Sequence, residues 1–508
     1  MLFFLTSLFE KTVPTGLSSY MINKHLSSIF NTYLPIAIFI ICFAFKFAFI
    51  DKRDISIDEP FSIFHAQQDL KHIFNLSTEG EPNTPLFLII LHFWIKIFGY
   101  DGTLLRILPL IFNSLTAVII YKIGKRFFNV QSAIAASLMF ILSLSQFFHG
   151  LEVRTYSMFI LATALTLYCF LNVVRKGSVF NVILLVVSNL FVVYSHYFGW
   201  FIIISEGIAT LLFFNKTNTL KRLGLSLGLT IIGFVPMIRI MINQFFLSNR
   251  GTWLSSPSAG DFKKELLFVF NHQSLILVFK IILIVGVALM LFRYFIHKEW
   301  KPNFNTNYIM LLLWSVIPFS LMYFISSKIP IFTGRYILYT APAFYLLATV
   351  TISTLYNKIK LLEIIALLVT VIVMGLHLRI LPHDFGWRDI KKAAIFIRHK
   401  EKELDDRIII IYPAWTDLEL VYHYDLELFK NYTDYKDNCR KRGLIGAWYS
   451  NNVAEIALSN KNKDIILLSN TGSGETEIMN CALHTSHTFI KKAAFPEFYN
   501  VGIYKTRE

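Results

Sequence analysis

Residues 33–70 read YLPIAIFIICFAFKFAFIDKRDISIDEPFSIFHAQQDL and place an apolar run directly before two adjacent carboxylates, Asp58 and Glu59. The run is long enough for a membrane-spanning helix, which needs about 20 apolar residues. Carboxylates are costly close to the hydrocarbon core of a bilayer. The acid pair therefore either starts a helix or performs chemistry at the membrane surface.

Apolar runs of this kind recur along the chain. It has 508 residues, of which 55% are hydrophobic and 16% are charged, a composition typical of a polytopic α-helical membrane protein. We expect about eleven transmembrane helices, near residues 31–50, 103–121, 131–148, 156–173, 179–195, 197–214, 223–242, 275–292, 308–325, 336–355 and 361–379. Residues 1–30 lack the features of a cleavable signal peptide and are expected to be cytoplasmic or interfacial. The transmembrane domain is predicted over residues 31–380.

Basic residues gather in one set of loops between these predicted helices. With the N-terminus cytoplasmic, the loops contain Lys122, Lys125, Arg126, Arg175, Lys176, Lys216, Lys221, Arg222, Arg293, Lys298, Lys301, Lys358 and Lys360. Because cytoplasmic loops are enriched in Lys and Arg, residues 51–100 and everything after Arg379 should lie on the outer face. The net charge of +15 then reflects orientation and contact with anionic membrane lipids, and not binding of nucleic acid.

Both parts of the predicted outer face have a recognisable pattern. Within residues 51–100, the segments PFSIFHAQQDLKHIF and TPLFLIILHFWIKIFG predict helices that lie in the membrane interface. From residue 384 onward, helical and strand-like segments alternate and no run could cross a bilayer, which predicts a small extracytoplasmic α/β domain over 384–508. Cys439 and Cys481 lie in this domain, where an oxidising compartment would permit, without requiring, a disulfide between them.

The local setting of the acid pair does not by itself decide its role. If Ser56 were the N-cap, Glu59 would complete a capping box. Pro60 would then occupy a helical position that needs a backbone donor. We therefore expect Pro60 at the first helical position, Glu59 extended before it, and Asp58 outside the helix. A structural and a functional role are both compatible with this arrangement.

An acid pair just after the first span resembles the DE motif of GT-C fold membrane glycosyltransferases, which include the protein O-mannosyltransferases and the aminoarabinose transferases of lipid A. Three later segments, in the same order, are similar to that family: NTPLFLIILHFWIKIFGYDGTLLRILPLIFNSLTAVIIYKIGKRFF, HGLEVRTYSMFILAT and IPIFTGRYILYTAPAFYLLA. The resemblance covers about residues 31–390. It implies transfer of a sugar from a polyprenyl-phosphate carrier to an acceptor glycan, lipid or protein on the outer side of a bacterial inner membrane.

The resemblance also suggests roles for particular residues. Asp58 matches the first acid of the motif and would be the base that activates the acceptor. Glu59 would orient Asp58, hold a cation or bind the acceptor. Arg154 and Arg335, with Lys328 as a weaker third candidate, would neutralise the departing lipid phosphate. Arginines at the ends of spans also contact lipid headgroups without any catalytic role.

Several other residues near these motifs have open roles. Glu152 either neutralises Arg154 or is the second acidic site residue of the family, although some members carry an aspartate there. Tyr156 and Tyr336 follow the two arginines and are candidate site residues, as are His65 and His196. Asp58, Glu152 and His65 are candidate ligands of a divalent metal ion, with His149 and His196 as further histidines on the same face. No HxxxH or CxxC spacing supports such a site.

Glu206 in FIIISEGIAT is an acid in the middle of a predicted span. Such a residue is either functional or paired with a neighbouring helix. A transporter or lipid flippase with similar hydropathy is the alternative to the glycosyltransferase. A transporter would carry broken helices in two matching halves near the midplane of the membrane. The polar residues here instead lie at the outer ends of the spans, which favours the enzyme.

Overall fold

A computed structural model describes residues 17–79, 84–213, 217–248, 256–295, 302–356, 358–378, 389–404, 406–470, 479, 483–495 and 499–507. The chain divides into two compact units, and each is described by itself. The helical unit comprises Met1–Ala48, Leu76–Phe87 and Ile107–Arg379. The mixed unit comprises Phe49–Asn75, Leu88–Arg106 and Ile380–Glu508. The predicted end of the transmembrane domain at residue 380 stays a prediction. Most of residues 51–100 group with the C-terminal segment.

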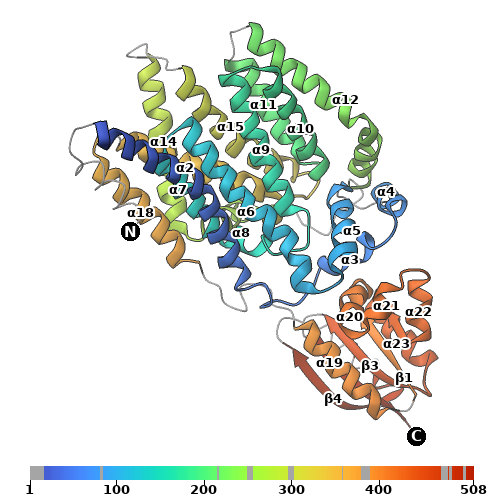
Figure 1. Ribbon diagram of the computed structural model, residues 1–508. Coiled ribbons are helices and arrows are strands. Elements are labelled where there is room, and N and C mark those ends of the chain that lie inside the picture. Colours follow the sequence, from blue (N-terminus) through green and yellow to red (C-terminus); the bar gives the residue numbers. More distant parts are fainter. Residues whose placement is uncertain are drawn as a thin grey trace. The chain divides into compact units, whose positions relative to one another are not determined.

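The helical unit is built from helices that overlap every predicted span (Figure 1). They are α2 (Leu17–Phe47), α6 (Gly102–Phe127), α7 (Val130–Ile141), α8 (Leu144–His149), α9 (Tyr156–Arg175), α10 (Val179–Ser195), α11 (Gly199–Phe213), α12 (Thr217–Ser248), α13 (Ala259–Phe270), α14 (Gln273–Phe295), α15 (Pro302–Ile325), α16 (Gly334–Ile337), α17 (Ala341–Leu355) and α18 (Lys360–Leu376). Among the described residues, 5 helices are long and apolar enough to cross a membrane, namely those over Gly102–Phe127, Tyr156–Arg175, Asn218–Phe246, Thr306–Ile325 and Gly334–Leu355. The count of about eleven spans stays a prediction.

Two predicted helix boundaries differ from the structure. The span expected over residues 131–148 is two helices, because the chain breaks at Leu142 and Ser143. The Ser143 side chain accepts a hydrogen bond from the backbone N–H of Gln146 and caps α8. The first helix begins at Leu17, well before the expected start near residue 31. Of the predicted N-terminal segment, residues 1–16 lie outside the described residues.

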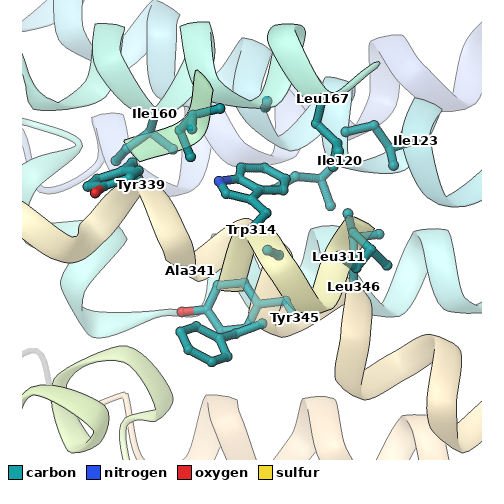
Figure 2. Close-up of a cluster of buried hydrophobic side chains, with 14 of the residues drawn as sticks. Ile120, Ile123, Ile160, Leu167, Leu311, Trp314, Tyr339, Ala341, Tyr345 and Leu346 are labelled. Atoms are coloured by element: carbon teal, nitrogen blue, oxygen red, sulfur yellow. The ribbon is translucent and has the colours of Figure 1, made fainter. Parts of the chain in front are cut away.

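The core of the helical unit is a continuous cluster of apolar side chains from distant helices. Figure 2 shows Trp314 of α15 beside Ile120 of α6, Ile160 and Leu167 of α9, and Tyr345 of α17. Trp314 is 1% exposed. Helix association inside a membrane depends on close packing of side chains and not on burial from water. This packing fixes the loops at the ends of α9 and α15, which carry several of the predicted site residues.

The mixed unit contains helices from residues 51–100 and an α/β segment. The helices from residues 51–100 are α3 (Glu59–Ala66), α4 (Leu70–Glu79) and α5 (Leu86–Phe98), the last two of which extend into the helical unit. The later helices are α19 (Ile390–Lys400), α20 (Asp417–Tyr424), α21 (Leu426–Lys430), α22 (Tyr435–Lys441) and α23 (Ser450–Ser459). Their predicted position in the interface or on the outer face stays a prediction.

The described strands form a 5-stranded sheet in the order β2-β1-β3-β5-β4. The strands are β1 (Arg407–Tyr412), β2 (Leu444–Gly446), β3 (Asp464–Asn470), β4 (His487–Phe495) and β5 (Tyr499–Thr506). β1 pairs in parallel with β2 and β3, whereas β5 runs antiparallel to β3 and β4. The run of isoleucines in β1 is buried throughout, as expected for a central parallel strand covered on both faces. Helix α19 packs on β4 and β5, and α23 packs on β1 (Figure 1).

Candidate functional site

The acid pair starts helix α3 in the mixed unit. Asp58 is the N-cap residue, Glu59 is the first helical residue and Pro60 the second. The prediction that Glu59 is extended and that Pro60 opens the helix is therefore wrong by one position. A proline fits anywhere in the first turn, where backbone N–H groups have no intrahelical acceptor. Asp58 is half-buried, and its side chain does not cap the helix.

Glu59 is fully buried in an ion pair with two arginines. The Arg106 guanidinium donates to it through Nε, at 3.2 Å from Oε1, and through Nη2, at 2.8 Å from Oε2. Nη2 of Arg53 lies 3.2 Å from the same Oε2. Arg106 also donates to the backbone carbonyls of Ile50, Arg53 and Asp54. Glu59 and Arg106 therefore fix the backbone that leads to Asp58, so we assign Glu59 a positioning role.

His65 also lies on α3 and forms a pair with a second histidine. Its Nδ1 is 2.9 Å from Nε2 of His72, and the two rings stack with their centroids 5.2 Å apart. Burial, and then the neighbouring His72, lowers the pKa of His65 to about 4. His65 is therefore uncharged at neutral pH, and one of the two facing nitrogens donates the hydrogen bond to the other.

The two arginine motifs of the helical unit converge on Tyr156. Arg154 precedes α9 and Arg335 lies in α16, and both act electrostatically on the Tyr156 hydroxyl. The Arg335 guanidinium lies over the ring of Tyr336, 5.3 Å from its centroid. The rings of Tyr156 and Tyr336 are 6.3 Å apart. The cluster of Arg154, Tyr156, Arg335 and Tyr336, here called the arginine–tyrosine cluster, joins segments about 180 residues apart in the sequence, a separation at which only tertiary packing can bring side chains together.

Glu152 lies at the edge of this cluster and pairs with His149. Its Oε2 is 2.5 Å from His149 Nδ1, and both side chains are nearly inaccessible to solvent. The ring of His149 is also 5.4 Å from the ring of Tyr156. Glu152 further acts electrostatically on the Tyr156 hydroxyl. The structure therefore pairs Glu152 directly with His149, which the sequence indicates only as a further histidine near a possible metal site.

His196 follows α10 and closes the other side of the cluster. Its ring stacks on Phe198 with centroids 4.6 Å apart and lies 5.8 Å from the ring of Tyr336. The backbone N–H of Phe198 donates to Nδ1 at 3.2 Å, so the single proton of the neutral ring sits on Nε2. Burial, and then Arg154, lowers the pKa of His196 to about 3. His196 is therefore a neutral donor beside Arg154.

Other predicted residues lie apart from the cluster. Lys328 is exposed in the turn after α15, and none of the described contacts joins its side chain to the arginine–tyrosine cluster. Glu206 is buried and accepts a hydrogen bond from Asn189 of α10 at 3.0 Å. This contact between α10 and α11 matches the helix-pairing alternative for Glu206.

Two charged residues near these sites were not predicted from the sequence. Lys46 of α2 is fully buried and donates to Asn113 Oδ1 at 2.5 Å and to the Gln146 carbonyl at 2.9 Å. Its signal was a lone lysine inside an apolar run, which is unusual in a membrane span. Glu265 of α13 accepts from the backbone N–H of Gly334, directly before Arg335, and burial raises its pKa. No sequence signal marks Glu265, because its partner lies in another segment.

A metal ion and a disulfide were the remaining expectations. Among the described residues, no group of three or more His, Cys, Asp or Glu side chains could hold a metal ion. We therefore derive no chemistry through a metal at Asp58, Glu152 or His65. Cys42, Cys169 and Cys439 are buried, and no disulfide joins any two of these described cysteines. Cys481 lies outside the described residues, so the Cys439–Cys481 pair stays a prediction.

Comparison with known proteins addresses the fold. Residues 81–241 match the family model described as dolichyl-phosphate-mannose-protein mannosyltransferase. No curated protein matches the chain. The crystal structure of apo ArnT from Cupriavidus metallidurans is similar with a TM-score of 0.58 and 12% identity, over 94% of this chain and 98% of that chain. The structure of the same protein bound to undecaprenyl phosphate gives a TM-score of 0.54 and 13% identity, over 93% of this chain and 97% of that chain. The chain therefore has the GT-C-type fold that its motifs predict, and it is an integral membrane protein.

Proposed function

We propose that the chain is a membrane glycosyltransferase that moves a sugar from a polyprenyl-phosphate carrier to an acceptor glycan, lipid or protein. The observation that carries this proposal is the arginine–tyrosine cluster. Arg154 and Arg335 both act on Tyr156 within one cluster. Two guanidinium groups near one buried tyrosine, with Arg335 lying over the ring of Tyr336, form a site suited to a phosphate group.

The chemistry of the transfer requires such a site. The acceptor attacks the anomeric carbon, the bond between that carbon and the phosphate oxygen breaks, and polyprenyl phosphate leaves. Negative charge grows on the phosphate as the bond breaks, and fixed cations and N–H donors stabilise it. Arg154 and Arg335 would supply the positive charge. His196, with its proton on Nε2, would supply a neutral donor beside Arg154.

The acceptor must also lose a proton to a base. Of the acid pair, Glu59 is held in a buried ion pair with Arg106, whereas Asp58 is half-buried at the N-cap of α3. Asp58 is therefore the better candidate base of the two, because a carboxylate locked between arginines is a poor proton acceptor. A positioned base of this kind contributes roughly 10²–10⁴-fold to a rate.

The comparisons support the class of carrier. ArnT, which has a similar fold, has been crystallised with undecaprenyl phosphate bound. The family model that matches residues 81–241 is also named for transfer from a lipid phosphate sugar. Which sugar and which acceptor are used depends on side-chain contacts in the site, and fold similarity does not determine those contacts.

Binding of the carrier phosphate tests the arginine–tyrosine cluster. The full chain in lipid nanodiscs would be titrated with undecaprenyl phosphate while its thermal unfolding is followed, since a ligand of the folded state raises the unfolding temperature. Arg154→Ala and Arg335→Ala should each weaken binding by about 10- to 100-fold. Arg175→Ala is the matched control, because Arg175 is exposed at the opposite end of α9. Unchanged affinity in both cluster variants would remove the cluster from the phosphate site.

Activity tests the base. Mass spectrometry of surface glycans and lipids, with and without the protein, should reveal a product that carries an added sugar. Asp58→Asn should abolish that product while the protein stays folded and inserted. A product at wild-type level in the Asp58→Asn variant would contradict the assignment of Asp58. A change of lipid distribution without any glycosylated product would favour the transporter or flippase alternative.

A further inference from the structure

The segment that leads to Asp58 is bound by helix α20, far away in the sequence but in the same mixed unit. The backbone N–H of Ile57 donates to Oε1 of Glu419 at 2.7 Å. Nε2 of His423, one helical turn later, is 2.7 Å from the carbonyl oxygen of Ile55 and must be its donor. The α19 helix adds a third contact, from the backbone N–H of Lys391 to Asp54 at 3.0 Å. Helices α19 and α20 of the C-terminal segment therefore bind three of the four residues from 54 to 57, namely Asp54, Ile55 and Ile57.

Ile57 has a backbone conformation that it would not adopt without such support. Its φ is 58°, in the left-handed region, where a β-branched side chain is a genuine outlier. Residues in such conformations persist only where their surroundings hold them, and they concentrate at functional sites. Glu419 is the side chain that binds the Ile57 N–H, and it is 1% exposed. A carboxylate is a strong acceptor for a backbone N–H.

The position of Ile57 gives this contact its meaning. Ile57 directly precedes Asp58, so its φ sets the direction in which the chain enters α3 and presents the Asp58 carboxylate. On the other side of Asp58, Glu59 is fixed by Arg106. The residues on both sides of Asp58 are therefore held through buried carboxylates, Ile57 by Glu419 and Glu59 by its own pair with Arg106.

We propose that Glu419 is a positioning residue for Asp58. It holds Ile57 in the left-handed conformation and thereby makes the C-terminal segment part of the catalytic apparatus. His423 supports the same turn through Ile55. This inference rests on the proposed function for its catalytic consequence, but its structural part can be tested without any activity measurement.

Hydrogen–deuterium exchange provides that structural test. In the full chain in nanodiscs, the peptide that contains Ile57 should exchange about ten- to a hundredfold faster in Glu419→Ala than in the wild type, since the amide loses a charged acceptor. Glu419→Gln should exchange at close to the wild-type rate, because its side-chain carbonyl still accepts the N–H. Glu427→Ala is the control, because Glu427 is exposed and pairs with Lys430 on its own helix. Equal exchange in Glu419→Ala and wild type would overturn the inference.

Sugar transfer then separates positioning from general stability. Glu419→Ala should lower kcat at least about tenfold, with little change in affinity for undecaprenyl phosphate, since the arginine–tyrosine cluster is untouched. Adding Ile57→Asn should restore part of the rate, because Asn adopts the left-handed region far more readily than Ile. Faster exchange with an unchanged kcat, or no rescue by Ile57→Asn, would refute the positioning role. If the wild type transfers no sugar, the proposed function fails while the exchange result still decides whether Glu419 holds the turn.

Discussion

Replacement of Glu59 by glutamine is the most informative single change in the mixed unit. The Glu59→Gln variant keeps the size and shape of the side chain but removes its charge. Arg106, which is 2% exposed, would then be buried without its carboxylate partner, and its remaining acceptors would be neutral: the glutamine side-chain carbonyl and the backbone carbonyls of Ile50, Arg53 and Asp54. Neutral carbonyls stabilise a buried guanidinium much less than a carboxylate at 2.8 Å.

The expected cost follows from the geometry of this pair. Removal of one partner from a buried ion pair costs about 3–5 kcal/mol. A loss of 1 kcal/mol lowers the melting temperature of a domain of this size by about 2–4 °C. The unfolding temperature of the mixed unit in Glu59→Gln should therefore fall by roughly 6–20 °C. The Arg106→Met variant should be similarly destabilised, because it leaves Glu59 without its bidentate partner.

Thermal unfolding of the full chain in nanodiscs, followed by tryptophan fluorescence, measures this effect. The double variant Glu59→Gln/Arg106→Met should be more stable than the sum of the single changes predicts, because the more deeply buried arginine is removed together with its carboxylate partner. The exposed pair Glu427–Lys430 is the control, and Glu427→Gln should shift the unfolding temperature very little. A Glu59→Gln variant that unfolds at the wild-type temperature, or a cycle without coupling, would refute the structural role of Glu59. Loss of transfer without any loss of stability would instead point to a direct role in chemistry.

Three further predictions concern titration and thiol chemistry in the mixed unit. The pKa of His65 is about 4, below the ordinary 6.5. As the pH drops from 6.5 to 4, His65 is therefore protonated first in the unfolded chain, and the stability of the fold falls by at most about 3 kcal/mol. The unfolding temperature of His65→Gln, measured across this pH range, should lack this part of the pH dependence. Burial raises the pKa of Asp417 from 3.8 to about 6, so the contribution of Asp417 to the stability of the fold is present below pH 3.8 and is lost as the pH rises through 6. Asp417→Asn should therefore stabilise the chain by at most about 3 kcal/mol at pH 7.5 and have no effect at pH 3.5. An equal stabilisation at both pH values would contradict this. Peptide mass spectrometry of the unreduced full chain should show Cys439 linked to Cys481, whereas alkylation of all 4 thiols without reductant would disprove the disulfide.

The class of the protein and the residues of its candidate site follow from local sequence patterns. Apolar runs of the right length predict helices wherever they occur, because that signal is local, and every predicted span overlaps a helix. After residue 384, where the sequence predicts alternating helical and strand-like segments, the chain forms strands β1, β3 and β5. The DE, RTY and GRY motifs indicate Asp58, Arg154 and Arg335 through their residue types and their order along the chain. β2 and β4 gave no such signal, since β2 has 3 residues and β4 is a largely exposed edge strand with lysines.

Which residues act together depends on the packing of distant segments. The sequence leaves the role of Glu59 open, and its buried ion pair with Arg106 favours the positioning role that we propose. The contact between Ile57 and Glu419 joins residues 362 positions apart, and neither residue carries a local signal of its partner. Hydrogen bonds of this kind follow from the packing of whole helices and from a left-handed turn that the sequence around Ile57 does not favour. The physical reason is that helix formation depends on neighbouring residues, whereas a site depends on side chains that meet only after the chain has folded.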